Sequence, residues 1–81
     1  MNRSFTLAAC PIGQSAVISS LAHDAPARRR LGELGFASGS EVRPLFRAPS
    51  GDPTAHAVCG TVVALRRQDA EKIFLVSFGK E

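Results

Sequence analysis

The spacing of hydrophobic and polar positions changes twice along the chain. Residues 14–22, QSAVISSLA, are rich in β-branched side chains and place Ala16 and Ile18 on one face, which predicts a strand. A segment with a longer period follows. From Gly39 onward the two-residue alternation typical of strands returns. The pattern therefore predicts a strand, a helix and then a series of short strands.

The longer period lies in residues 25–34, APARRRLGEL. Its apolar positions recur at i, i+4 and i+7: Ala27, Leu31 and Leu34. Asp24 can cap the first turn, and Pro26 is suited to a first helical turn because its fixed φ is helical. Gly35 stands where a left-handed C-terminal cap is expected, and Phe36 just beyond can fold back onto the helix. We expect one α-helix of about three turns.

Four segments after this helix have the composition and alternation typical of strands. They are residues 41–46, 54–60, 61–66 and 72–78, the second and third hinged at Gly60. Pro44 removes a backbone donor, so we expect an edge or a bulge there. RAPSGDP, residues 47–53, is rich in turn formers, and RQDAE, residues 67–71, can form a single helical turn. Residues 4–14 read as an extended lead-in.

About five short strands with one helix after the first strand predict a mainly β fold. We expect a small, partly open barrel rather than a βαβ sheet, and residues 1–81 fit a single domain. No apolar run approaches the ~20 residues that cross a bilayer, and no export signal is recognisable, so a cytoplasmic, non-spanning protein is expected.

Composition limits the partners. Ten Lys and Arg stand against seven Asp and Glu, giving a formal charge of +3 and a pI near 9.5. This mild excess favours acidic partners without requiring nucleic acid. The chain has no Trp and no Tyr, so aromatic stacking on bases has little support, and we expect no nucleic-acid binding.

The densest positive charge is Arg28–Arg30. Successive helical residues fan out by ~100°, so these side chains cannot form one stripe. Asp24 and Glu33 lie three or four residues from these arginines, so they can neutralise part of the positive charge through local pairs. The simplest interpretation is a solvated helix face, and the functional alternative is a docking surface for an acidic partner protein.

Little in the sequence suggests catalysis. His23 and His56 are the only histidines, and neither is spaced with a nucleophile and an acid as a catalytic triad would require. PSGDP lacks the lysine of a phosphate-binding loop, and turn chemistry explains it better. We therefore expect a protein that is not an enzyme and that requires no cofactor.

Metal binding is a more specific chemical alternative than catalysis. The residues competent to act as ligands are Cys10, His23, Asp24, His56 and Cys59. They lack paired spacing, and on an uninterrupted strand His56 and Cys59 would face opposite ways. A weak surface site for Zn²⁺ or Fe²⁺, shared between molecules through His23 or His56, is favoured over a buried one.

Residues 31–76, LGELGFASGSEVRPLFRAPSGDPTAHAVCGTVVALRRQDAEKIFLV, resemble the small bacterial ferrous-iron transport protein A family, FeoA. The matching positions are Leu31, Leu34, Gly35, Phe36, Gly39, Val42, Pro49, Gly51, Asp52, Pro53, Val58, Gly60, Ala64, Leu65, Arg66, Ala70, Ile73 and Val76. PIGQSAVISSL upstream also looks like the family's first strand. The chain is similar, in addition, to the C-terminal domain of iron-dependent repressors of the diphtheria-toxin-repressor type.

The resemblance implies an SH3-like barrel and a cytoplasmic accessory or regulatory role in ferrous-iron uptake. The implied partner is the membrane ferrous-iron transporter with its cytoplasmic GTPase domain, to which transport and GTP hydrolysis would belong. The candidate contact residues are Arg28, Arg29, Leu45, Phe46, Arg47, Pro49, Gly51, Asp52 and Pro53.

Two further interpretations stay open. Open barrel edges would let two copies of the chain pair as a homodimer. The alternative function is a metal-responsive protein that binds Fe²⁺ or Zn²⁺, in which the metal could bridge a dimer.

Overall fold

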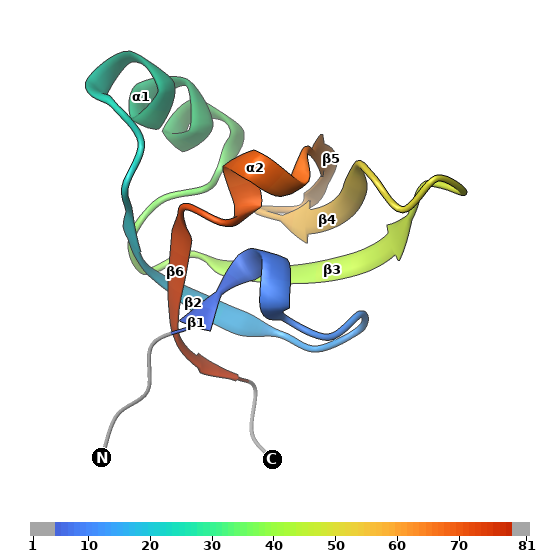
Figure 1. The fold of residues 1–81 in the computed structure, drawn as a ribbon. Helices are drawn as coiled ribbons and strands as arrows, with labels where there is room; N and C mark the ends of the chain where they lie inside the picture. Colours follow the sequence, from blue (N-terminus) through green and yellow to red (C-terminus); the bar gives the residue numbers. More distant parts are fainter. Residues whose placement is uncertain (1–4, 79–81) are drawn as a thin grey trace.

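A single antiparallel sheet runs through the computed structural model, which describes residues 5–78 (Figure 1). Its strands lie in the order β1-β6-β2-β3-β4-β5 and curl around the core without closing. They are β1 Phe5–Thr6, β2 Ala16–Leu21, β3 Glu41–Arg47, β4 Thr54–Val58, β5 Thr61–Leu65 and β6 Ile73–Phe78. The helical segments are a 3₁₀ turn η1 Leu7–Ala9, the helix α1 Ala25–Leu34 and the single turn α2 Arg67–Ala70.

The predicted fold class is confirmed, with one addition at the N-terminus. The sheet has six strands among the described residues rather than about five, because the two-residue strand β1 pairs with β6. The expected extended lead-in is wrong over η1, where the chain folds into a 3₁₀ turn that buries Leu7 to 1% exposure. Burial of one large aliphatic side chain outweighs the extended preference of so short a segment.

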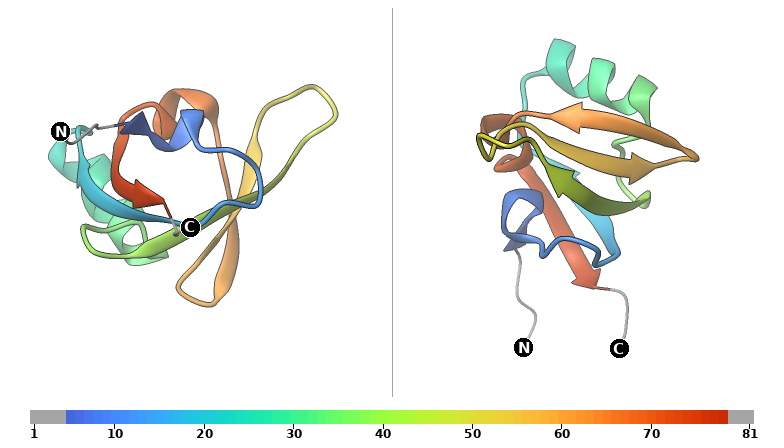
Figure 2. Two further views of the ribbon diagram at one scale, coloured as in Figure 1. Left: turned by 90° about the horizontal axis from the view of Figure 1, so that it is seen from below. Right: turned by 90° about the vertical axis from the view of Figure 1, so that its right-hand side faces the viewer.

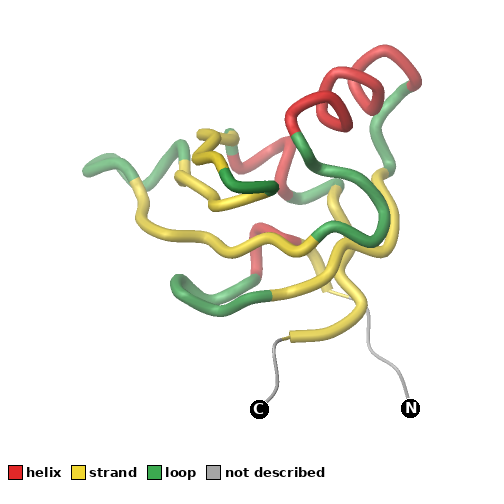
Figure 3. The backbone as a smooth tube through the Cα atoms, turned by 180° about the vertical axis from the view of Figure 1, so that it is seen from behind, coloured by secondary structure: helices red, strands yellow, loops and turns green. Residues whose placement is uncertain are grey.

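Helix α1 begins and ends where the sequence predicts. The Asp24 carboxylate accepts the backbone N–H of Ala27 at 3.0 Å and so caps the first turn. Gly35 ends the helix with φ +112°, and Phe36 then folds back, its N–H donating to the Leu31 carbonyl at 2.9 Å. The helix lies over one corner of the sheet, joined to it by loops (Figure 3).

The core lies on the concave face of the curled sheet. Alternate residues of each strand point inward, as period two requires. The largest fully buried side chains are Leu7, Ile18, Phe36, Val42, Pro44, His56, Val58, Ile73 and Leu75. Within residues 5–78 no helix has the length and apolar character needed to cross a membrane.

A bulge interrupts β3 just after Pro44. Pro44 pairs with His56, but the next pair is Phe46 with Ala55, so Leu45 is an extra residue on β3. The bulge expected near Pro44 is confirmed. Its effect is to turn Phe46 to the outside and Arg47 toward the concave side.

A two-residue turn joins β4 and β5. Cys59 has φ +48° and Gly60 has φ +79°, and positive φ at both central residues is what a type I′ hairpin turn requires. The prediction that strand 54–60 continues through Cys59 is therefore wrong. Cys59 lies in the turn, exposed, whereas His56 is buried in β4.

Candidate functional site

Residues 47–53, the β3–β4 loop, project from the body of the molecule (Figure 2, left). The loop is held by its own hydrogen bonds. The Gly51 N–H donates to the Ala48 carbonyl at 2.7 Å, and the Ala48 N–H donates to the Pro53 carbonyl at 2.9 Å. The Ser50 hydroxyl donates to the Asp52 carbonyl at 2.9 Å. The loop is thus already ordered and would lose little entropy on contact with a partner.

One side chain attaches the loop to the rest of the fold. The Asp52 carboxylate accepts a hydrogen bond, 2.9 Å long, from the backbone N–H of Arg67. Arg67 is the first residue of α2. This bond satisfies a donor that a helix leaves free at its N-terminus. It also brings the chain around Arg67 beside the loop.

Phe46, at the base of the loop, is 61% exposed. Its cross-strand neighbours on the same outer face are small: Ala55 on β4 and, beyond it, Ala64 on β5. Val62, 58% exposed, lies on the same face, two residues along β5 from Ala64. The outer face of β3, β4 and β5 therefore carries an apolar patch of the kind found at protein interfaces.

Behind the loop lies a small hollow, the Arg47–Arg67 pocket. Its wall comes from four segments: Leu7 to Ile12, the end of β3 with the loop, β4, and Leu65 to Ala70. The residues that matter for its chemistry are Cys10, Ile12, Arg47, His56, Leu65 and Arg67. It encloses about 20 Å³, room for roughly one water-sized atom group.

His56 forms part of this wall and is 1% exposed. Burial lowers its pKa, an effect partly opposed by backbone hydrogen bonding at Val63 and Thr54, so the imidazole is neutral at pH 7. Its Nδ1 has no hydrogen-bond partner among residues 5–78. The ring meets Phe36 edge-on, with 6.2 Å between centroids. His56 is therefore a structural core residue with one unused polar atom.

Cys10 is the second titratable group in the wall. Burial raises the pKa of its thiol to about 11, so the thiol stays protonated at neutral pH. Its Sγ donates to the Gln14 carbonyl at 3.4 Å. A protonated thiol is neither a nucleophile nor a good metal ligand.

The arginines of α1 lie apart from the loop. Arg28 donates from Nη1 to the His23 carbonyl at 2.9 Å and borders a shallow hollow near Ser19 and Phe36. Arg29 is exposed. Helix α1 and the β3–β4 loop stand at different sides of the molecule (Figure 1 and Figure 3). The structure therefore splits the predicted contact residues into two surfaces.

The local charge pairs expected on α1 do not form. Among residues 5–78 the one ion-pair contact within 4.0 Å is between His23 and Asp69. Asp24 instead uses its carboxylate for the helix cap, and Arg28 uses its guanidinium for a backbone carbonyl. Asp24 satisfies an N–H that the helix leaves free at its start, and Arg28 satisfies a carbonyl just before the helix, so neither side chain takes part in a charge pair on α1.

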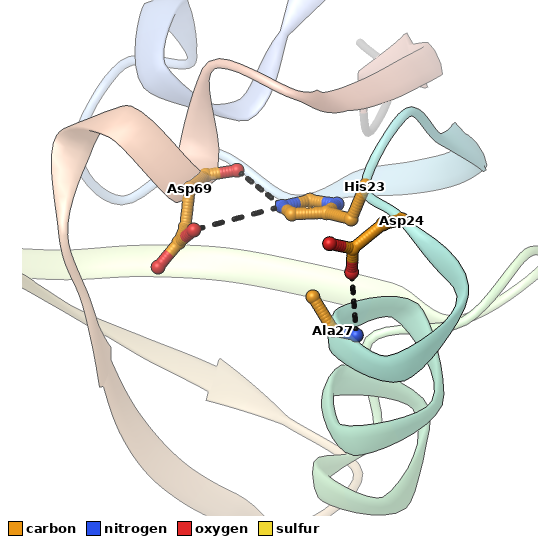
Figure 4. A network of polar contacts seen from close by, with 4 residues as sticks. All are labelled: His23, Asp24, Ala27 and Asp69. Carbon is orange, nitrogen blue, oxygen red and sulfur yellow. Dashed lines mark hydrogen bonds and ion pairs between the residues drawn. The ribbon is translucent and has the colours of Figure 1, made fainter.

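His23 links α1 to α2 (Figure 4). The ring is 5% exposed, and Nε2 donates to the backbone carbonyl of Asp69 at 3.1 Å, with the Asp69 carboxylate 3.8 Å away. Asp24, next in sequence, points to the helix start rather than to His23's partner. His23 thus serves packing between two helical segments.

The metal-ligand candidates do not converge within the described chain. No three His, Cys, Asp or Glu side chains of residues 5–78 come together as a group that could hold an ion. His56 and Cys10 border the same pocket, His23 and Asp24 lie at α1, and Cys59 lies in the β4–β5 turn. Both buried histidines have an unpartnered Nδ1, but neither is supported by two further ligands. These residues do not fit an intrachain metal centre.

Sequence reasoning missed Arg67 and Ile12, which border the pocket from segments 55 residues apart. No local pattern could reveal them, because only strand pairing brings η1, the loop and α2 together. The apolar character of the outer β5 face was visible as Val62 and Ala64, but its exposure was not.

The chain matches a family model and several solved structures. The model of the FeoA domain matches residues 5–77. The solution structure of the FeoA protein from Chlorobium tepidum is 33% identical, covers 95% of this chain and 74% of that one, and gives a TM-score of 0.84. Among curated proteins no sequence matches at a significant level.

Two further structures extend the comparison. Stenotrophomonas maltophilia FeoA, solved as a zinc complex and described as a prokaryotic SH3 domain protein, is 39% identical over 88% of both chains, with a TM-score of 0.75. A manganese-dependent transcriptional repressor gives a TM-score of 0.79 at 23% identity, over 95% of this chain and 43% of that one. The second likeness concerns the fold alone.

Proposed function

This chain belongs to the FeoA family, which is linked to ferrous-iron transport, and we propose from that premise that it is an accessory, non-catalytic protein of ferrous-iron uptake. It would act in the cytoplasm by contact with the membrane Fe(II) transporter and its GTPase domain. Transport and GTP hydrolysis would remain with that partner.

One observation carries the proposal beyond family membership: an ordered, projecting loop with Phe46 exposed at its base. A bulge in β3 presents this side chain outward, and internal hydrogen bonds fix the loop beside it. Exposed aromatic side chains on preordered backbone are common anchors of protein interfaces. We propose Leu45, Phe46, Arg47, Pro49 and Gly51–Pro53 as the main contact, and Arg28 and Arg29 as a second, electrostatic one.

The test is binding of the purified chain to the GTPase domain of its own transporter, with and without GTP. We expect micromolar binding that weakens as salt rises. Phe46→Ser should weaken binding at least about tenfold, because loss of a buried aromatic anchor typically costs more than ~1.4 kcal/mol. Val76→Ser is the matched control, since Val76 is 54% exposed on β6, away from the loop.

Charge reversal tests the second surface. Arg29→Glu should weaken binding mostly at low salt, and Arg43→Glu on β3 is the matched control. Arg29 is the cleaner site than Arg28, whose guanidinium also bonds the His23 carbonyl. Unchanged affinity for Arg29→Glu would remove α1 from the interface, and no binding of the unmodified chain in either nucleotide state would overturn the proposal.

The second candidate function, a metal-responsive protein, has one observation in its favour: the Stenotrophomonas relative is described as complexed with zinc. We rank it second because the residues of this chain do not fit an intrachain centre. Equilibrium dialysis against Zn²⁺ and Fe²⁺ separates the two. Ligation by His or Cys must compete with protons, so uptake that is only millimolar and insensitive to pH would reject it.

We also propose that a second copy of the chain is a partner, through the edge strand β5. Strand β5 is the last in the sheet order and pairs with β4 in a regular register over Thr61–Leu65. It contains no charge, no proline and no bulge, the usual protections of an edge. Pairing along a strand of five residues would bury little surface, so the dimer would be weak.

A further inference from the structure

The Arg47–Arg67 pocket carries positive charge that the described chain does not neutralise. Arg47 and Arg67 are the charged residues of its wall, and no carboxylate of residues 5–78 lies within 4.0 Å of either guanidinium. Asp52 is the neighbouring acid, but its carboxylate accepts the Arg67 backbone N–H. An anion in the pocket would therefore meet positive charge that no neighbouring carboxylate neutralises.

The inner wall adds an unused polar atom. His56 is almost fully buried, and its Nδ1 has no partner among the described residues. A neutral imidazole carries one N–H, and backbone hydrogen bonding at Val63 and Thr54 uses it, so Nδ1 presents a lone pair and the two arginines supply the attraction for an anion. The Cys10 thiol on the same wall already bonds the Gln14 carbonyl, so it does not compete for the space.

The size of the pocket restricts the ligand. The enclosed volume of about 20 Å³ admits one oxygen atom, so the rest of a bound anion would lie outside the hollow. Ile12 lines the pocket and is 41% exposed, so a methylene stem behind that oxygen would find an apolar contact. A carboxylate side chain fits this site, because one oxygen can enter the hollow, the second can pair with an arginine and the methylene stem can lie against Ile12.

We propose that the Arg47–Arg67 pocket receives the carboxylate of an Asp or Glu side chain from the partner protein, with Arg47 and Arg67 binding it at the mouth. The inference deepens the proposed function and rests on it, because the β3–β4 loop forms one wall of the pocket. It assigns a chemical specificity to that contact: the partner segment is acidic where it meets the loop.

The first experiment needs no partner. The full chain is titrated with sodium acetate at constant ionic strength set with sodium chloride, and amide and His-ring resonances are followed by NMR. We expect saturable shifts at residues 47–56 and 65–70, half complete at or below about 0.1 M acetate. Arg67→Gln and Arg47→Gln should each weaken binding about tenfold, as loss of a charged hydrogen bond does.

Arg66→Gln and Arg43→Gln are the matched controls. Each removes the same charge from the neighbouring sequence or strand without touching the pocket wall. Equal weakening in the controls, linear shifts without saturation, or equally tight binding of inorganic phosphate at the same residues would overturn the carboxylate assignment.

A second experiment separates this inference from the proposed function. Binding to the transporter's GTPase domain is measured for Phe46→Ser and for the double variant Arg47→Gln/Arg67→Gln. Weakening by both supports the carboxylate contact. Weakening by Phe46→Ser alone leaves the accessory role standing and refutes the pocket as its acidic-residue receptor. If neither variant weakens binding, the proposal that the loop surface contacts the partner is itself refuted.

Discussion

The bulge residue Leu45 determines which side chains of β3 face outward. Without this extra residue, Phe46 would continue the inward series of Val42 and Pro44 and join the core. With it, Phe46 faces solvent and Arg47 turns toward the pocket. The Pro44 signal predicted a bulge, but a sequence cannot tell which residue the ladder skips. Hydrophobicity alone would place Phe46 in the core and does not indicate its exposure, whereas Asp24, Gly35 and Phe36 act as local capping rules predict.

Gly35 gives a prediction at the scale of a single Cβ atom. Its φ is +112°, and an added Cβ would lie 2.9 Å from the Cys59 Sγ and 3.2 Å from a Val58 methyl group. Gly35→Ala should therefore lower the free energy of unfolding by at least about 2 kcal/mol, from backbone strain plus the close contact. Urea denaturation followed by circular dichroism measures it.

Gly39→Ala is the matched control for that change. Gly39 has φ +92° but nothing within 4 Å of an added Cβ, so only the backbone strain of about 1 kcal/mol remains. Equal losses of unfolding free energy in the two variants would show that the close contact between the β4–β5 turn and the end of α1 does not affect stability.

Elements differ in how far local pattern determines them. Helix α1 has a cap, a period and a stop signal, and all three agree with its observed bounds. The short strand β1 and the turn η1 have no such signals, because pairing with β6 and burial of Leu7 create them. Strand β5 was predicted, but its place at the sheet edge depends on the order of all six strands.

The edge of β5 can be tested by paired charges. Thr61, Val63 and Leu65 turn their N–H and C=O groups to β4, because Thr61 flanks a two-residue turn, so those of Val62 and Ala64 point outward. Two copies paired antiparallel about Val63 would place Val62 opposite Ala64 of the second copy. Val62→Lys/Ala64→Lys should then abolish self-association, measured by sedimentation at rising concentration, because like charges oppose.

The rescue variant fixes the register. Val62→Lys/Ala64→Glu carries the same two substituted sites but places opposite charges across the pair, so it should associate at least as well as the unmodified chain. A monomer at every concentration for the unmodified chain, or dimers that persist in the double-lysine variant, would exclude pairing along β5.

At the scale of the whole molecule, the class and family could be predicted while the pocket could not. Periodicity and turn residues indicated a small mainly β domain, and the spacing of the motif residues indicated the family. The Arg47–Arg67 pocket joins four segments whose proximity follows only from the complete strand order. Its residues have no shared motif, and His56 in particular reads as a possible ligand although its burial makes it part of the core.

His56 ties the stability of the whole fold to pH. Its pKa is lowered in the folded state by burial, so the unfolded chain, with an ordinary pKa of about 6.5, binds this proton more tightly. The contribution is complete above that pH and is lost as the pH falls below it. The free energy of unfolding, from urea titrations, should therefore be lower at pH 5 than at pH 7.5.

His56→Gln removes this titration and should reduce the difference between the two pH values, even if it lowers stability at both. An unchanged difference would assign the pH dependence to other groups.

Strand β1 begins and strand β6 ends on the same side of the sheet, paired antiparallel, while α1 and the β3–β4 loop lie elsewhere (Figure 1). A domain with this layout can be tethered to another polypeptide at either end without hiding the faces that meet a partner. In the manganese-dependent repressor a part with this fold makes up 43% of the chain. For protein engineering, fluorescent or affinity fusions at either end should leave the loop and its pocket open.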